Sequence, residues 1–430
     1  MKKILILIAI VNVVSASSVK DILYSIDNSP KVKSAKYLSK AAYESYLSAL
    51  GNKMPRVDLS YIASYSKEYP SIKMRLPKML PINARVGLKK HFIGEIRVAY
   101  PLFSGFAISS MIDKANWKAK EAKLRVQDLK RNLYLKAIDT FSKIDAINAQ
   151  IKALKKAQNA LESGYKKADG LYKAGLIAQS ELFRIKAQLF GIKANITNLE
   201  AQKKSLLNLL GYITGTKVKR VQGRLHLKRL PRLSTFIAKA YANRSDLLAI
   251  KAQIEQKRAD ISLAKSQNYP QINAIAALKK EGDNFKLTKN DFSNINKSYV
   301  GVQMKWNIFN GGKTKHQIEA AKYLKLAKSL EYNDYKNLIK MQIKNAKNEL
   351  NSIYAMLKEA KAELKARQSY YNLSKGRFQN GLISADEFAN AIASWANAKA
   401  NYQTILAKLT TQKAKLWLLA GLDSFREAIK

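Results

Sequence analysis

Two hydrophobic patterns alternate along this chain, and the longer one has the spacing of helices that supercoil around partners. Apolar side chains recur in steps of three and four residues through long stretches of both halves. Such a seam predicts long coiled-coil helices, one of them running for roughly 85 Å from Ala107 to about Gly164. The seam consists of Ile144, Ile147, Ile151, Leu154, Leu161, Tyr165, Ala168 and Tyr172 in the first half, and of Leu350, Ile353, Leu357, Ala360, Leu364 and Tyr371 in the second.

The second pattern has a period of two residues and marks four short segments, each of which we predict to be a β-strand. Apolar and polar side chains alternate within residues 57–65, 96–102, 272–278 and 300–308. Alternation over about ten residues, with aromatic side chains near the ends, is typical of the strands of a membrane barrel. It is equally typical of an ordinary antiparallel sheet that has one face in water. The alternation alone favours neither.

Geometry favours a barrel to which several chains contribute. Four strands are too few to close a barrel, because the smallest single-chain barrels have about eight. An open sheet edge cannot lie in hydrocarbon, where its N–H and C=O groups find no water. If these strands enter a membrane, several copies of the chain must pool them. The long helices would then continue the barrel as a tube.

The chain is a duplication. Gly175-Leu176-Ile177 returns 206 positions later as Gly381-Leu382-Ile383, and each copy lies between two helical runs, where a helix hairpin would reverse. The register between the copies holds without a gap from about Arg97 to Gly215. We therefore predict two structural repeats, residues 17–223 and 224–430, each with a helix, two strands and a long helix hairpin.

The N-terminus has the pattern of a secretory signal. Two lysines precede an almost wholly apolar run from Ile4 to Val14, and small residues follow it. This run is too short to span a bilayer as a helix, which needs about 20 residues. We predict a signal peptide at residues 1–16, cleaved near Ala16, and hence an exported protein.

Charge and composition exclude several functions. The chain has 77 Lys and Arg against 31 Asp and Glu, a net charge of +46, but export makes a nucleic-acid partner a poor explanation of that charge. Cysteine is absent, which removes disulfides and thiolate chemistry. The three histidines have no partner at a metal-ligand spacing. We expect no catalytic site, no metal and no cofactor.

Taken in order and in duplicate, these features resemble the TolC family of outer-membrane efflux proteins over nearly all of the mature chain. The resemblance rests on Asn28-Ser29-Pro30, Met54-Pro55-Arg56-Val57, Tyr100-Pro101-Leu102-Phe103-Ser104-Gly105 and Gly175-Leu176-Ile177 in the first half, and on Arg244-Ser245-Asp246-Leu247, Tyr269-Pro270-Gln271-Ile272, Trp306-Asn307-Ile308-Phe309-Asn310-Gly311-Gly312 and Gly381-Leu382-Ile383 in the second.

The resemblance implies a mainly α fold with a small β part. It implies a homotrimer, in which four membrane strands per chain form a twelve-stranded β-barrel in the outer membrane and the helices form a periplasmic tunnel. The channel would be a passive exit duct of a tripartite efflux or type I secretion system. Its partners would be a periplasmic adaptor protein, an inner-membrane transporter and outer-membrane lipid, with no enzymatic activity. The alternative is an exported, non-transporting coiled-coil protein that binds anionic cell-envelope polymers.

The resemblance also implies where the functional residues lie. In the family, acidic side chains six and nine residues after the second turn glycine ring the tunnel mouth; here these positions are Glu387 and Asn390, and their first-repeat counterparts are Glu181 and Arg184. Phe378 and Ile383 stand where some members lock the closed mouth through a Tyr and an Arg, so packing is expected to replace polar links.

Two further sets complete the predicted sites. Turn residues that would contact the adaptor are Gly175, Leu176, Gly381 and Leu382, and membrane-strand residues are Val98, Tyr100, Val302, Met304 and Trp306. On the strands we expect Arg97, Gln303 and Lys305 to face the lumen, and the apolar set to face lipid.

Overall fold

A computed structural model describes residues 18–74, 82–223 and 225–429. The signal peptide predicted at residues 1–16 lies outside these residues. The chain divides into two compact units. Unit 1 comprises the chain up to residue 39, residues 122–249 and residues 331 onward, and unit 2 comprises residues 40–121 and 250–330. Each predicted repeat contributes segments to both units.

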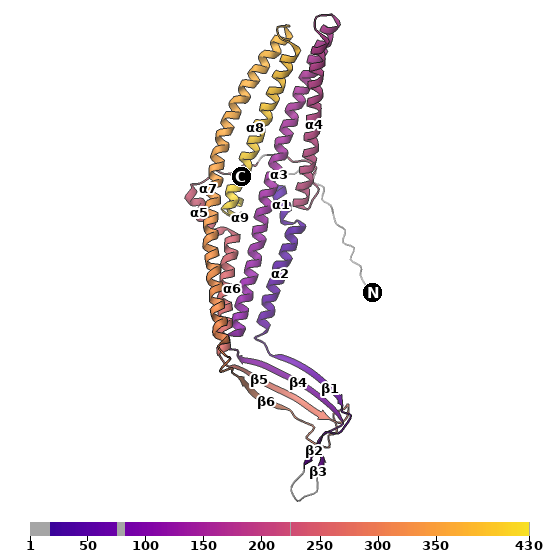
Figure 1. Ribbon diagram of the computed structural model, residues 1–430, viewed down its shortest axis with the longest axis vertical. Coiled ribbons are helices and arrows are strands. Elements are labelled where there is room, and N and C mark those ends of the chain that lie inside the picture. The colour runs from indigo at the N-terminus through magenta and orange to yellow at the C-terminus, as the bar shows by residue number, and fades with distance from the viewer. Residues whose placement is uncertain (1–17, 75–81, 224, 430) are drawn as a thin grey trace. The chain divides into compact units, whose positions relative to one another are not determined.

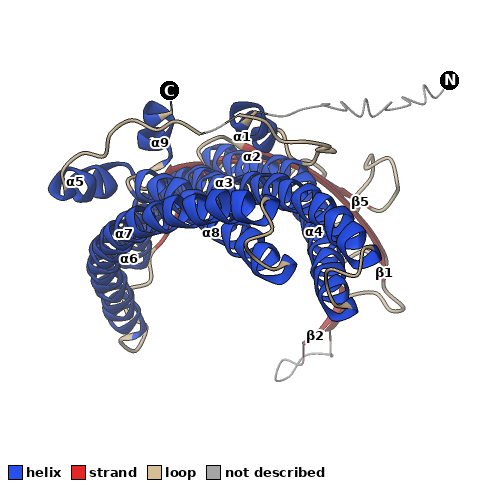
Figure 2. Cartoon of the chain, turned by 90° about the horizontal axis from the view of Figure 1, so that it is seen from above, coloured by secondary structure: helices blue, strands red, loops and turns tan. Residues whose placement is uncertain are grey.

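Helices make up most of the chain (Figure 2), and the two longest have the spacing of the predicted repeat. α3 (Ala107–Lys173) and α7 (Lys313–Gln379) each have 67 residues, and their ends are also offset by 206 positions. The length corresponds to about 100 Å of helix. The predicted helix from Ala107 is confirmed and continues beyond Gly164. The other helices are α1 (Val19–Asp27), α2 (Pro30–Gly51), α4 (Gln179–Thr214), α5 (Leu233–Asn243), α6 (Ser245–Lys265), α8 (Ala385–Leu419) and α9 (Leu422–Ala428), with a 3-10 turn at Ser266–Asn268.

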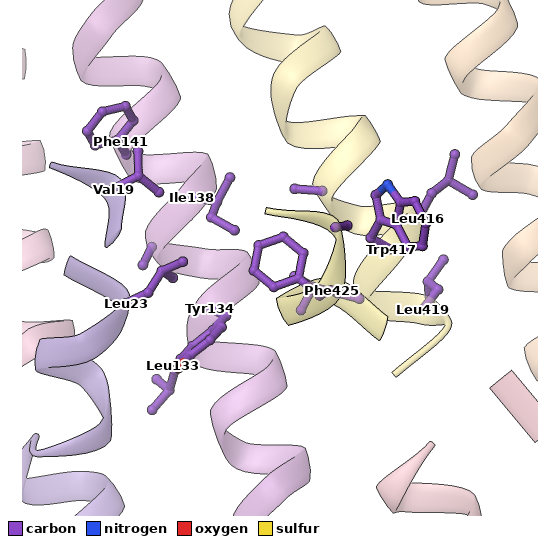
Figure 3. Packing of buried hydrophobic residues seen from close by; sticks show 14 of the residues in the cluster. Val19, Leu23, Leu133, Tyr134, Ile138, Phe141, Leu416, Trp417, Leu419 and Phe425 are labelled. Carbon is purple, nitrogen blue, oxygen red and sulfur yellow. The ribbon is translucent and has the colours of Figure 1, made fainter. Parts of the chain in front are cut away.

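The predicted seam is the core of unit 1. Ile144, Leu161 and Ala168 of α3 and Leu350 of α7 are fully buried among side chains of the neighbouring helices. One part of this core gathers short helices around α3: Leu23 of α1, Tyr134 and Ile138 of α3, and Phe425 of α9 converge there (Figure 3). The apolar stripe with a period of 3.5 residues therefore packs against partner helices, as the sequence predicts, in two clusters, while its last residue in the first half, Tyr172, is 37% exposed.

Unit 2 contains a curved antiparallel sheet of four strands (Figure 1). Its order is β1 (Arg56–Tyr65), β4 (Lys90–Phe103), β5 (Gln271–Gly282) and β6 (Tyr299–Lys305), so both repeats supply two strands and β4 pairs with β5 across the repeat boundary. A small hairpin of β2 (Ser71–Met74) and β3 (Ile82–Arg85) lies within the β1–β4 connection. The sequence pattern did not predict this hairpin, because its strands are too short for alternation to show.

One predicted strand is shorter than the pattern indicates. β6 ends at Lys305, and Trp306 and Ile308 lie beyond it. The indole N–H of Trp306 donates a hydrogen bond to the carbonyl of Asn268 at 3.1 Å. The prediction of Trp306 as a strand residue is therefore wrong, because alternation continues into the connection after the ladder of backbone hydrogen bonds has stopped.

The strand register separates two faces. Val98 lies opposite Val57 and Ala276, and Ala276 lies opposite Val300, so these four side chains share one face. The same face carries Leu59, Ile96, Tyr100, Ala274, Leu278, Val302 and Met304, and we call it the apolar face. The opposite face, called the polar face, carries Asp58, Glu95, Arg97, Asn273, Lys279, Gln303 and Lys305, with Ile275 and Ala277 buried among them. The predicted alternation is confirmed.

Within the described ranges, no helix pairs enough length with enough apolar character to cross a membrane.

Candidate functional site

The turns of the two helix hairpins are built in the same way. Gly175, after α3, has a φ of 72°, and Gly381, after α7, has a φ of 75°. The N–H of Leu176 donates to the carbonyl of Leu171 at 2.9 Å, and the N–H of Leu382 donates to the carbonyl of Arg377 at 2.9 Å. This bond is the six-to-one hydrogen bond of a glycine-terminated helix. A Cβ on either glycine would meet no atom within 4 Å, so the positive φ, and not a lack of space, requires glycine.

Aromatic rings pack the end of α7 against the start of α8. The Phe378 ring is buried and stacks on Phe388 with ring centroids 4.8 Å apart. Tyr371 stacks on Trp395 at 5.1 Å, and Ile383 packs against the same cluster. Phe378 and Ile383 thus occupy an apolar core within the chain, consistent with a mouth residue that acts through packing.

A lysine of the first hairpin binds the end of the second. The ammonium of Lys167, on α3, donates to the carbonyls of Phe378 at 2.9 Å and Gln379 at 2.7 Å. It also lies 5.2 Å from the centroid of the Phe378 ring. These carbonyls belong to the last turn of α7, where the helix dipole favours a cation. Sequence reasoning missed this contact, since nothing in the sequence distinguishes Lys167 from the many lysines around it.

A second polar link joins α4 to α8. The amide N–H of Gln188 donates to Asn390 at 3.2 Å and to Asp386 at 3.4 Å, and the Asn390 amide donates to Asp386 at 3.3 Å. The predicted mouth residue Asn390 is therefore hydrogen-bonded to α4 of its own chain. Asp386, in the first turn of α8, accepts hydrogen bonds from both amides and lies at the centre of this link.

The acidic candidates lie in the first turns of α4 and α8. The Ser384 hydroxyl accepts from the N–H of Glu387 at 3.1 Å and fixes the start of α8. Glu387 and Glu181 are half-buried and Arg184 is exposed. None of these three forms an ion pair with another described residue. The three charged side chains are therefore available to bind a partner.

The turn leucines are exposed. Leu176 is 70% exposed and Leu382 is 65% exposed, each next to its glycine. Each leucine lies on a turn that its glycine and the six-to-one hydrogen bond hold in one shape, so its position relative to the hairpin is fixed. Of the predicted strand residues, Val98 and Tyr100 lie in β4 and Val302 and Met304 in β6.

No cluster of three or more metal-ligating side chains occurs among the described residues.

Solved structures with the same fold share little sequence with this chain. A membrane protein from Pseudomonas aeruginosa superposes with a TM-score of 0.80 at 13% identity, covering 95% of this chain and 91% of its own. The CmeC outer membrane channel of Campylobacter jejuni gives 0.76 at 16% identity, covering 96% and 86%. The open-state MtrE outer membrane channel of Neisseria gonorrhoeae gives 0.76 at 14% identity, covering 94% and 89%. A search of curated proteins finds no match.

The family comparison covers both repeats. Residues 24–216 and 236–422 match the family model described as outer membrane efflux protein. The matched segments contain both turn glycines, all four strands of the sheet and both long helices. The chain belongs to the outer membrane efflux protein family, and it is a transport protein of the outer membrane, with its helical part in the periplasm, and not an enzyme.

Proposed function

We propose that three copies of this chain form one passive exit duct, with their sheets pooled into a twelve-stranded barrel and their long helices forming a tunnel. The observation that carries the proposal is the open sheet of unit 2. Its edge strands β1 and β6 each have one side without a partner strand among the described residues. Edges of this kind cannot lie in hydrocarbon unless they pair with another copy.

The apolar face of the sheet supports a lipid environment. Its side chains are exposed to an extent that water would penalise; Val300 is 85% exposed, and Leu59, Leu278, Val302 and Met304 are exposed as well. Lipid would cover the exposed apolar side chains, and pairing with other copies would satisfy the backbone N–H and C=O groups of both edge strands. A non-transporting protein that binds envelope polymers would have no use for such a face.

The hairpin turns supply the proposed mouth of the duct. Glu387 and Glu181 begin α8 and α4 with unpaired carboxylates, so three copies would present rings of negative charge. Lys167 and Gln188 hold the second hairpin to the first, and we infer that these bonds favour the closed mouth. Opening would require the α7–α8 hairpin to leave both contacts.

The partners in this proposal are a periplasmic adaptor and an inner-membrane transporter that supplies the energy. Gly175 and Gly381 fix the turns, and the exposed Leu176 and Leu382 form the apolar contact to the adaptor. Such a contact explains why two leucines stay in water in the isolated chain.

Oligomer mass and conductance test the proposal. The full chain, purified in mild detergent without heating, should run on a denaturing gel as a heat-modifiable trimer and open ion-conducting pores in a planar bilayer. A folded monomer with native strand content and no conductance would contradict the duct and favour the envelope-polymer alternative.

A further inference from the structure

The loop between β5 and β6 folds back over the apolar face of the sheet. Gly94 and Gly282 lie on that face, and a Cβ on Gly94 would stand 2.7 Å from Cδ1 of Leu287. A Cβ on Gly282 would stand 2.8 Å from the carbonyl oxygen of Lys289. Both glycines therefore make room for the loop. From the same face, the Tyr61 hydroxyl donates to the carbonyl of Phe285 at 2.9 Å, and their rings are 5.4 Å apart.

Hydrogen bonds within the loop fix its shape. The N–H of Asp283 donates to the carbonyl of Lys289 at 2.8 Å, and the N–H of Thr288 donates to the side chain of Asn284 at 3.1 Å. This closed segment places Phe285 and Lys286 at its outer surface. Phe285 is 75% exposed although its backbone is held to the sheet.

The charges at this place are unbalanced. Lys280 lies opposite Gly94 and so projects on the apolar face, and both Lys280 and Lys286 are exposed without an ion pair to any described residue. The nearby Glu281 projects on the polar face, where Lys279, Lys297 and His91 surround it.

The loop's own carboxylates are Asp283 and Asp291. Asp291 pairs with Lys289 at 3.6 Å, which leaves Asp283 as the loop carboxylate that has no ion pair with a described residue.

The height of Lys280 on the sheet matches a lipid headgroup. The apolar face runs along β5 from Ile272, opposite Met304, to Leu278, and Lys280 follows. The eight residue steps from Ile272 to Lys280 span roughly 27 Å along the strand. At the tilt of about 40° that barrel strands have, this is roughly 20 Å across the membrane, which is most of the ~25 Å apolar band of outer-membrane barrels. The other end of β4 leads into α3, which is periplasmic, so Lys280 and the loop lie at the outer leaflet.

Resting on the duct proposed above, we propose that Lys280, Lys286 and Phe285 form a binding site for a phosphate-bearing lipid of the outer leaflet. The two ammonium groups bind headgroup phosphates as charge-assisted hydrogen-bond donors. The Phe285 ring lies at the boundary between headgroups and acyl chains, a region where aromatic rings are favoured. Tyr61 supports that ring from the sheet.

Lipid binding to the purified trimer tests this site. Delipidated full-length protein in mild detergent is titrated with bis-phosphorylated lipid A, and bound lipid per chain is counted by native mass spectrometry. The same titration uses lipid A with both phosphates removed, so that only the headgroup charge differs. The variants are Lys280→Gln/Lys286→Gln and Phe285→Ser. The matched control is Lys73→Gln/Lys305→Gln, which removes two other exposed lysines of the same unit.

We expect the Lys280→Gln/Lys286→Gln variant to bind the phosphorylated lipid about tenfold more weakly, as two exposed charge contacts can supply. The Lys73→Gln/Lys305→Gln control should bind the phosphorylated lipid like the wild type. The dephosphorylated lipid should bind the wild type and the Lys280→Gln/Lys286→Gln variant equally. Equal binding of the phosphorylated lipid by the double variant and the wild type would overturn the site. Conductance measured on the same samples separates the two proposals, because a conducting variant that has lost the lipid leaves the duct intact.

Discussion

Arg244 and Asp246 form a buried two-point ion pair at the junction of α5 and α6. The Arg244 Nε lies 3.0 Å from one Asp246 oxygen, and its Nη2 lies 2.5 Å from the other. Arg131 of α3 reaches the same carboxylate at 3.1 Å, and the hydroxyl of Tyr335 of α7 donates to it at 2.8 Å. One carboxylate thus joins the short helices to both long helices of unit 1. Pairs of this two-point geometry are strong and directional.

Acid should weaken unit 1 through this carboxylate. Burial alone would raise the pKa of Asp246, but the bonds and charges of Arg244 and Arg131 outweigh it and lower the pKa to about 2. An unfolded aspartate has a pKa of about 3.9, so the folded state favours the charged form. The stabilisation is fully present above about pH 4 and is lost as the pH falls to about 2. Thermal unfolding followed by circular dichroism between pH 5 and 2 should show this loss.

The Asp246→Asn variant provides the comparison for the acid effect. It should be destabilised by about 3–5 kcal/mol at pH 7, because Arg244 is left buried without its counter-charge. Its remaining stability should change less between pH 4 and pH 2 than that of the wild type. An unchanged pH slope in the variant would show that other carboxylates govern the acid response.

Loss of the Lys167 ammonium should favour the open mouth. In Lys167→Met the carbonyls of Phe378 and Gln379 lose their cross-hairpin donor, and charge-assisted bonds of this kind contribute about 1.5–3 kcal/mol each when buried, less where solvent reaches them. We expect a higher mean conductance in planar bilayers than for the wild type. Lys166→Met, which changes an exposed neighbour with no such bond, is the control. Identical conductance traces for the wild type, Lys167→Met and Lys166→Met would show that Lys167 does not stabilise the closed mouth.

The sequence predicts the helices and strands well, because their side chains repeat with a regular period. It predicts poorly the contacts that depend on one side chain. The 3.5-residue seam specifies α3 and α7 because burial of one stripe repeats over many turns. Gly175 and Gly381 specify the turns because only glycine takes a positive φ there without strain. Lys167 and Gln188 were not predictable, because their partners lie on another hairpin about 200 residues away and no local pattern marks them. Trp306 was misplaced since alternation reports side-chain faces and not backbone pairing.

Two neighbouring positions of β6 should respond oppositely to arginine. Val302 lies on the apolar face and Gln303 on the polar face. Val302→Arg places a charge in lipid and should cost about 2–4 kcal/mol near the membrane midplane, which lowers the yield of heat-modifiable oligomer. Gln303→Arg should assemble normally and shift ion selectivity toward anions. Equal tolerance of the two changes would mean that the faces or the membrane are assigned wrongly.

The mouth of the duct should carry negative charge. The chain carries a net charge of +46, so a duct whose selectivity followed the net charge alone would be expected to favour anions. Three Glu387 carboxylates converging near one axis would instead repel each other, attract cations and hold divalent ions. We therefore expect a cation-selective wild type whose selectivity and divalent block both weaken in Glu387→Gln. Glu162→Gln, which removes an α3 carboxylate that already has Lys193 as its partner, should leave both unchanged. An anion-selective wild type, or a Glu387→Gln variant with the block intact, would exclude Glu387 from the ring and direct the search to Glu181.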